Sequence, residues 1–515
     1  MRYFVGDIML LPNQGEAQIR NQIANRLRIP SNSFRFEWVN RRARLVDNRL
    51  CVFYDCAVDT FSFVRNTQIH FFEEMAPFQF PSFHGKGAIC VIGAGFSGIF
   101  CAYLLAKHGA EVIVLEQGGN AANREKSCRD FREKQIFEPA SNPSYGFGGF
   151  SALHGGFLQR EIRTSQSQFV LNALVSLGLP ESVKKEGFSF VSKDQVNSLC
   201  RTMERYITDC GGRVIYGAKA LSVDRFLGWP KGVSFLLDGT RRSVKAVQVV
   251  VAGGNTPLGL ETAAKCRVPL KNAAPRLGVF VEINGRDFET NYFGRGGMST
   301  LPPLYVEENV PSPEGRDTRI QFGYCNAPLT NAASVPFRVD LGLQLNPWSG
   351  AGNAIACVST SLTEQEAAEC SLTEPYDFGG KLLSNSFSRL SPYAIPAEMM
   401  GDFLSKREPM LLGSVRPSYF GGVYLANLHK ILPRSLAQSL LSGVFEMGRR
   451  YPLFASSRAL VSGFSTMGSS RYLPLPISAG GRGIYALLPR DKEGQDLLKA
   501  ALRAFETAAR VLSDA

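Results

Sequence analysis

The sequence has no apolar run long enough to form a membrane-spanning helix. Charged residues or prolines interrupt its longest hydrophobic stretches well short of the roughly eighteen residues that such a helix requires. The first residues, Met1-Arg-Tyr-Phe-Val-Gly-Asp-Ile, suggest a strand with an early acid and not a cleavable signal. We therefore expect a cytoplasmic protein that has no membrane anchor.

Histidine and paired cysteine are also scarce. The 515 residues include five histidines, and none of the 11 cysteines belongs to a C-x-x-C pair. Cys90, Cys101 and Cys357 lie inside apolar runs, which is typical of buried free thiols in a reducing compartment. The sequence therefore indicates neither a metal site nor a disulfide framework.

Clusters of basic residues are absent, although the formal net charge is +12. Because Lys and Arg are dispersed along the chain, we do not expect a nucleic-acid partner; the excess charge favours a phosphate-bearing ligand. The content of 44% hydrophobic and 20% charged residues is ordinary for a globular protein, and the length allows two or three domains.

The most informative motif is a glycine-rich turn between two apolar runs. Residues 88–92 lead into Gly93, Gly95 and Gly98 at G-x-G-x-x-G spacing, a helical pattern follows, and a second apolar run ends at Glu116. This order predicts a dinucleotide-binding βαβ unit, in which the helix N-terminus binds pyrophosphate and the acid accepts ribose hydroxyls. The predicted cofactor-binding residues of this unit are Gly93, Ala94, Gly95, Phe96, Ser97, Gly98, Glu116 and Gln117.

Further candidate contacts lie in a polar helix, in a glycine-rich aromatic loop at 144–157, on a strand and at a second glycine turn. Glycine permits close approach of the backbone to a cofactor in both glycine-rich segments. Arg124 could equally lie on a solvated helix face and not contact the cofactor. The glycine-rich loop could likewise be an ordinary surface loop. These candidates are Arg124, Gly148, Gly149, Phe150, Ser151, Ala220, Ala252, Gly253 and Gly254.

The order of these motifs resembles FAD-binding proteins of the glutathione-reductase type. More narrowly, the chain resembles the bacterial group of uncharacterised FAD-dependent dehydrogenases, which also begin with a small α+β module. Residues 145–158 align without a gap to the glycine-rich loop of that group, and residues 416–433 and 466–470 resemble later segments. The resemblance implies that FAD is the cofactor.

The resemblance is weakest at positions where the family carries charges. Phe147, Gly155 and Phe157 stand where its loop has Glu, Asp and Lys. The family also ends with a glycine-rich turn before the last helix, whose acid binds the ribityl chain. Here Gly483-Ile-Tyr485 begins that motif without the glycines that should follow, and Asp491 is the candidate substitute. These departures imply an intact ADP half and an altered flavin half of the site.

His154 is the histidine of the glycine-rich loop. Since its ordinary pKa lies near neutrality, it is a candidate catalytic acid or base beside the flavin. A buried histidine without chemistry and a covalent flavin attachment are the alternatives.

Changes of pattern along the chain predict an α/β protein with three parts. We expect a small α+β module of βαββ type at 1–74, a linker at 75–86 and the first part of a Rossmann-like FAD-binding domain at 87–269. An inserted, mostly β substrate-side domain follows at 270–405, and residues 406–515 return to the FAD-binding domain with a C-terminal helix.

The predicted function is an FAD-dependent oxidoreductase that moves a hydride between a small organic substrate and the flavin. No second G-x-G-x-x-G unit follows a strand, so electrons would be exchanged with the organic substrate, a transient nicotinamide or a redox partner. Two alternatives stay open, namely a non-redox isomerase, cyclase or lyase with structural FAD, and a non-enzymatic nucleotide-binding or RNA-associated protein.

Overall fold

The computed structural model describes residues 1–64, 69–160, 163–254, 257–292, 304–311, 315–323, 330–331, 341–342, 352–371, 378–386, 393–419, 421–466, 472–474, 482–488 and 496–514.

The N-terminal module is an antiparallel sheet with one helix. β1 (Arg2–Leu10) leads into α1 (Glu16–Leu27), and β2 (Phe34–Val46), β3 (Arg49–Thr60) and β4 (His70–Phe71) complete the strand order β2-β3-β1-β4. Ile19, Ile23 and Leu27 recur at helical spacing and are buried with the apolar side chains of the sheet. The expected small α+β fold is confirmed, and the two-residue strand β4 adds to the predicted βαββ order.

The central sheet has five parallel strands in the order β25-β13-β5-β6-β9. These strands are β5 (Ile89–Ile92), β6 (Val112–Leu115), β9 (Arg213–Ile215), β13 (Gln248–Val251) and β25 (Ile484–Ala486). The residues of β5, β6 and β13 are buried without alternation, as expected for parallel strands covered on both faces. This sheet confirms the predicted Rossmann-like domain.

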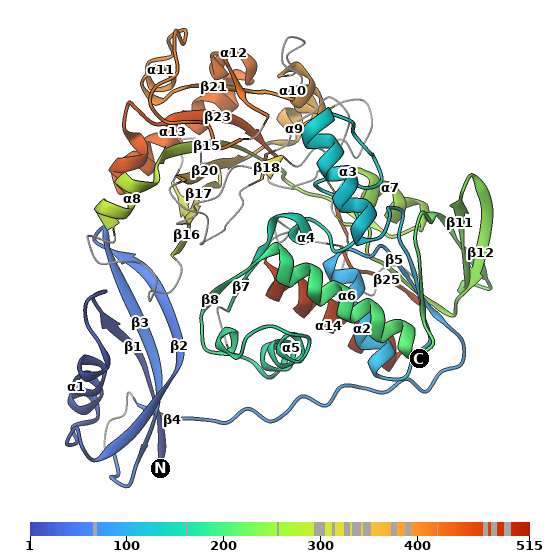
Figure 1. Ribbon diagram of the computed structural model, residues 1–515, viewed down its shortest axis with the longest axis horizontal. Helices are drawn as coiled ribbons and strands as arrows, with labels where there is room; N and C mark the ends of the chain where they lie inside the picture. The colour runs from blue at the N-terminus through green and yellow to red at the C-terminus, as the bar shows by residue number, and fades with distance from the viewer. Residues whose placement is uncertain are drawn as a thin grey trace.

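Helices cover one face of the parallel sheet and a small antiparallel sheet covers the other (Figure 1). The helical layer is formed by α2 (Phe96–Lys107), α5 (Ser165–Ser176), α6 (Lys193–Asp209) and α14 (Leu497–Ser513). The opposite layer is formed by β10 (Lys219–Phe226), β11 (Trp229–Leu237) and β12 (Thr240–Lys245). Both layers exclude water from the strands whose carboxyl ends build the candidate site.

A seven-stranded sheet forms the third part, in the order β16-β17-β20-β15-β23-β21-β22. Its strands are β15 (Arg276–Asn284), β16 (Tyr305–Val310), β17 (Thr318–Gly323), β20 (Asn353–Ser361), β21 (Ile395–Met399), β22 (Val423–Leu425) and β23 (Leu460–Ser465). The sheet continues to Ser465, beyond the boundary predicted at 405, and the chain rejoins the parallel sheet only at β25. The division into domains as a whole stays a prediction.

The remaining elements connect these three parts. They are α3 (Ala121–Lys134), α4 (Ser151–His154), β7 (Gly156–Gln159), η1 (Glu181–Lys184), β8 (Phe188–Val191), α7 (Pro257–Lys265), β14 (Leu270–Asn272), α8 (Gly285–Tyr292), β18 (Thr330–Asn331), β19 (Leu341–Gly342), α9 (Glu364–Cys370), α10 (Gly380–Asn385), α11 (Met400–Ser405), α12 (Leu428–Ile431), α13 (Arg434–Arg450), η3 (Pro452–Ala455) and β24 (Tyr472–Pro474).

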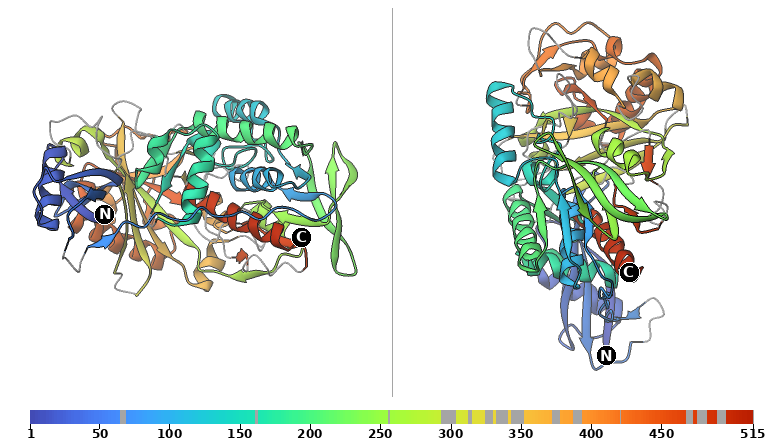
Figure 2. Two further views of the ribbon diagram at one scale, coloured as in Figure 1. Left: turned by 90° about the horizontal axis from the view of Figure 1, so that it is seen from below. Right: turned by 90° about the vertical axis from the view of Figure 1, so that its right-hand side faces the viewer.

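Figure 2 shows the N-terminal module at one end of an elongated molecule and the β11–β12 hairpin at the other. Within the described ranges, no helix has the length and apolarity needed to cross a membrane.

Candidate cofactor site

The G-x-G-x-x-G turn joins β5 to α2 and lies against the turn that follows β13. Gly93 has a φ of +103°, and a Cβ built there would lie 2.5 Å from the Ala252 carbonyl oxygen. A Cβ at Gly98 would lie 2.1 Å from the Gly93 carbonyl oxygen. Both positions therefore require glycine, and the two turns predicted to contact the cofactor meet directly.

Helix α2 begins at this turn, with Gly95 as its N-cap. Its first-turn N–H groups have no partner within the helix, so they can donate to an anion, and the helix dipole favours negative charge there. Phe96 contributes only its backbone, because its ring is buried and stacks on Phe100 at 6.2 Å. Ser97 is half-buried.

Glu116 connects the ends of β6 and β5. Its carboxylate accepts hydrogen bonds from the Ala94 N–H at 2.8 Å and from the Gly118 N–H at 2.7 Å. Burial raises the pKa of Glu116 despite these two bonds and the nearby Arg124. Since each oxygen has a further lone pair, the carboxylate can brace the turn and still accept a ribose hydroxyl. Gln117 follows it in a half-buried position.

The glycine-rich loop passes over the N-terminus of α2. The Gly148 N–H donates to the Ala94 carbonyl at 2.8 Å. Gly149 has a φ of +69°, and a Cβ at this position would lie 3.5 Å from the Phe96 backbone nitrogen. A side chain here would take up space beside the first-turn N–H groups, so glycine keeps that approach open. Phe150 and Ser151 continue the loop into α4.

Arg124 anchors this loop from α3. Its side chain is buried, and its guanidinium donates to the carbonyl oxygens of Asn142, Phe147 and Gly149. Burial lowers the pKa of Arg124 to about 10, so the group stays charged at neutral pH. The solvated helix face that was the alternative for Arg124 is excluded by this burial. Its donors hold the loop in place, and direct contact with the cofactor stays a prediction.

His154 ends α4 and is buried, 4.4 Å from the Phe150 ring by centroids. Burial and the positive charges of Arg124, Arg132 and Lys193 lower its pKa to about 3. The imidazole is therefore neutral at physiological pH, and its buried Nε2 has no hydrogen-bond partner among the described residues. In this state it can exchange a hydrogen bond with a bound group, whereas an acid role requires a higher pKa.

The second glycine turn and β10 complete the ADP side. The Ala252 N–H donates to the Ile92 carbonyl at 2.8 Å, and Gly253 and Gly254 follow in half-buried positions. Ala220 is buried on β10, which enters beside Glu116 because the Ala218 N–H donates to the Glu116 carbonyl at 2.8 Å. These candidates thus gather at the carboxyl ends of the parallel strands, where ligands bind in open α/β sheets.

At the flavin side, Asp491 lies outside the described residues. Asp496 is not among the residues predicted from the sequence; it caps α14 by accepting from the Leu498 and Lys499 N–H groups. Asp496 is 3% exposed, and its Oδ2 has no hydrogen-bond partner among the described residues. The signal that would have found it is an acid directly before a strongly amphipathic helix.

The residues present fit FAD on three observations. The glycines of two turns leave no room for side chains, and the first turn of α2 has free donors. His154 Nε2 and Asp496 Oδ2 are buried atoms without a hydrogen-bond partner among the described residues, although Lys499 Nζ lies 3.8 Å from Asp496 Oδ2. Among the described residues, no three His, Cys, Asp or Glu side chains are grouped to hold a metal ion.

Two family models match separate parts of the chain. Residues 91–139 match an NAD(P)-binding Rossmann-like domain, and residues 350–468 match a C-terminal domain of FAD-dependent proteins. The first match contains the glycine fingerprint and Glu116, and the second contains most of the seven-stranded sheet. Together they confirm FAD as the predicted cofactor. The resemblance to the glutathione-reductase type and the narrower one to the uncharacterised FAD-dependent dehydrogenases both stay predictions.

Three individual proteins illustrate similarity at low identity. An uncharacterised protein of Clostridium beijerinckii is 24% identical over 401 residues, which cover 75% of this chain and 72% of that protein. The structure of CtdE in complex with FAD and a substrate has 8% identity, covers 83% of this chain and 80% of its own, and has a TM-score of 0.37. A geranylgeranyl bacteriochlorophyll reductase-like protein from Thermoplasma acidophilum has 12% identity, coverages of 83% and 78%, and a TM-score of 0.35. TM-scores this low establish neither a shared fold nor a shared function.

Proposed function

We propose that the protein is an FAD-dependent oxidoreductase that transfers a hydride between the flavin and a small organic substrate. The observation that carries this proposal is the cradle of glycine turns around the N-terminus of α2, in a chain whose residues 350–468 match FAD-dependent proteins. When bound, the flavin supplies the redox chemistry. The chain's residues supply binding, orientation and exclusion of water.

The residues divide these tasks between the two halves of the site. The first-turn N–H groups of α2 would hold the pyrophosphate, and Glu116 would accept from the ribose. On the flavin side, His154 would exchange a hydrogen bond through Nε2, and Asp496 would accept one through Oδ2. The seven-stranded sheet would form the substrate side, and the second electron carrier would be a transient nicotinamide or a redox partner. A cytoplasmic location also stays a prediction from the sequence.

The absorbance spectrum of the purified protein tests the first half of the proposal. We expect a flavin spectrum and release of FAD, identified by its mass, when the protein is denatured. A colourless protein that takes up no added FAD would contradict the proposal.

Anaerobic bleaching by candidate substrates tests the second half. We expect the visible absorbance to fall when a reducing organic substrate is added without oxygen. FAD that stays oxidised while the substrate is isomerised, cyclised or cleaved would replace hydride transfer with the non-redox alternative.

A further inference from the structure

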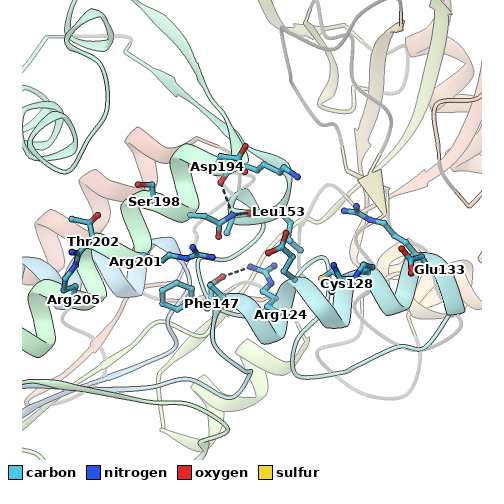
Figure 3. A pocket seen from close by; sticks show the side chains of 17 residues that line it. Arg124, Cys128, Glu133, Phe147, Leu153, Asp194, Ser198, Arg201, Thr202 and Arg205 are labelled. Atoms are coloured by element: carbon cyan, nitrogen blue, oxygen red, sulfur yellow. Dashed lines mark hydrogen bonds between the residues drawn. The ribbon is translucent and has the colours of Figure 1, made fainter.

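A separate cleft lies between α3 and α6 (Figure 3). Its volume is about 530 Å³, which lies within the range of small-molecule sites and is far more than one phosphate fills. Both helices present one face to it: α3 contributes residues at 121, 124–125, 128–129 and 132–133, and α6 contributes residues at 193–194, 197–198, 201–202 and 205. The cleft is therefore a product of two facing helices.

The lining of the cleft is rich in arginine. Arg124, Arg129, Arg132, Lys193, Arg201 and Arg205 line it, against the acids Glu125, Glu133 and Asp194. None of these nine side chains forms an ion pair with another described residue. In Figure 3 the Arg201 side chain points toward Arg124. An anion placed there would meet the guanidinium donors of Arg201 and the positive charge of Arg124, whose own N–H groups donate to the loop carbonyls.

The cleft is distinct from the predicted pyrophosphate position. Gly149 faces the N-terminus of α2, whereas Phe147, Ala152 and Leu153 of the same loop and α4 line the cleft. The loop is thus a shared wall between the two spaces. Arg124 spans this wall, because it lines the cleft and its Nη1 donates to the carbonyls of Phe147 and Gly149.

We propose that this cleft binds a phosphorylated small molecule of nucleotide size, in addition to FAD. Arg201 and Arg205, four residues apart on α6, and Arg129 and Arg132 on α3 would hold its phosphate groups. The Ser198 and Thr202 hydroxyls of α6 offer further polar contacts along the same face. The remaining volume would accept the rest of a nucleotide.

Calorimetric titration of the FAD-loaded full-length protein tests this proposal, with ADP, adenosine and inorganic phosphate as separate probes. We expect ADP to bind at about 0.15 M salt, the concentration at which interactions of exposed charges are already strongly screened. Arg201→Ala/Arg205→Ala should weaken this binding by about tenfold or more, since charge-assisted hydrogen bonds are lost. Arg241→Ala/Arg242→Ala, on the distant strand β12, is the matched control and should bind ADP like the parent.

Three outcomes would overturn the proposal. Unchanged ADP binding in the α6 variant would exclude the cleft as its site. Displacement of FAD by ADP, or loss of FAD from the α6 variant, would assign the cleft to the FAD site itself. Inorganic phosphate or adenosine that binds as tightly as ADP would exclude recognition of a whole nucleotide. If the protein holds no FAD but the α6 arginines still govern ADP binding, the proposed function fails and this inference stands.

Discussion

Gly98 is a residue at which one substitution should affect both the stability of the fold and the binding of FAD. We expect Gly98→Ala to reduce both the free energy of unfolding and FAD retention, because its methyl group would lie 2.1 Å from the Gly93 carbonyl oxygen. Overpacking of this kind costs about 1–3 kcal/mol, and relief of the clash must move the α2 N-terminus. Urea unfolding and the flavin-to-protein absorbance ratio measure the two effects.

Gly15→Ala is the matched control, since a Cβ at Gly15 has no heavy atom within 4 Å. Because Gly15 is the N-cap of α1, where alanine is less favourable than glycine, this variant should lose about 0.5–1 kcal/mol of stability but retain FAD like the parent. A Gly98→Ala variant with parental stability and FAD content would contradict the close packing of α2 on the fingerprint turn.

The buried His154 should make the free energy of unfolding depend on pH. Its pKa is lowered to about 3, so between about pH 3 and its ordinary value of 6.5 the unfolded chain binds a proton that the folded chain does not. The free energy of unfolding therefore rises with pH across this window. Above about pH 6.5 the increase due to His154 is complete. We expect His154→Asn to remove up to about 1.4 kcal/mol per pH unit from that slope.

Urea unfolding of the parent and variant at intervals from pH 4.5 to 7.5 measures this slope. His70→Asn, on the exposed strand β4, is the control for loss of an imidazole as such. A slope that His154→Asn leaves unchanged would show that the imidazole is not held neutral by burial.

Single-residue roles could be predicted from the sequence only where one local motif determines them. The spacing of Gly93, Gly95 and Gly98 is sufficient to predict a turn that excludes side chains. The sequence does not show that Arg124 is buried, because its donors meet carbonyls at 142–149 that only the folded loop brings there. The same holds for the low pKa of His154, which depends first on burial and then on cations from two helices.

At the scale of elements, Asp496 at the beginning of α14 should make the free energy of unfolding depend on pH. Burial raises the pKa of Asp496 to about 6, so the folded chain binds a proton between about pH 4 and 6 that the unfolded chain has lost. The free energy of unfolding therefore falls as the pH rises through this window. Asp496→Asn keeps the N-cap but removes the charge, so we expect it to be more stable than the parent by about 1–3 kcal/mol at pH 7.5.

Unfolding of FAD-free protein at pH 4.5 and 7.5 measures this difference, which should nearly vanish at the lower pH. Asp496→Ala is the second variant, and its loss of the cap should cost about 1 kcal/mol relative to Asn at both values. We also expect Asp496→Asn to release FAD more readily. Equal stability of the parent and Asp496→Asn at pH 7.5 would contradict a buried, charged carboxylate.

Helices and strands with strong local patterns can be predicted from the sequence. The distant elements that they pack against or pair with cannot. The polar stretch 121–134 and the apolar spacing after residue 496 predict α3 and α14 from composition and caps alone. The pairing of β25 with β13 joins residues more than 230 positions apart, so no local pattern reveals it. For the same reason the facing arginines of α3 and α6 were not expected to share a cleft.

At the scale of the whole molecule, the N-terminal module contacts the body through polar groups around β2 and through the buried side chains of Ala43 and Leu50. The Gly187 N–H donates to the Arg41 carbonyl at 2.8 Å, and the Arg41 N–H donates to the Lys185 carbonyl at 3.0 Å. Arg160 donates to the Val39 carbonyl at 3.1 Å. The sequence predicts this module and its linker, but no local pattern indicates where the module docks, because the contacts join segments about 145 residues apart.

The ion pair of Arg41 and Glu186 lies at the centre of this contact. It has two hydrogen bonds, of 2.7 and 3.2 Å, and the two side chains are 22% and 12% exposed. Because the pair is bidentate and largely buried, we expect Arg41→Ala and Glu186→Ala each to destabilise the docked module, with a coupling of about 1–3 kcal/mol in the double-mutant cycle. Arg35→Ala, an exposed arginine of the same strand, is the control.

Limited proteolysis separates docking from folding in these variants. The linker between β4 and β5 should be cleaved faster in Arg41→Ala than in the parent, while the flavin-to-protein ratio stays unchanged, since no residue of the candidate cofactor site touches this pair. Cleavage at the parental rate would mean that apolar contacts alone, such as those of Ala43 and Leu50 with the core of the seven-stranded sheet, hold the module in place. The module and the parallel sheet have separate hydrophobic clusters, so we expect FAD binding to be independent of module docking. Loss of FAD together with faster cleavage would contradict this and would mean that docking of the module shapes the cofactor site.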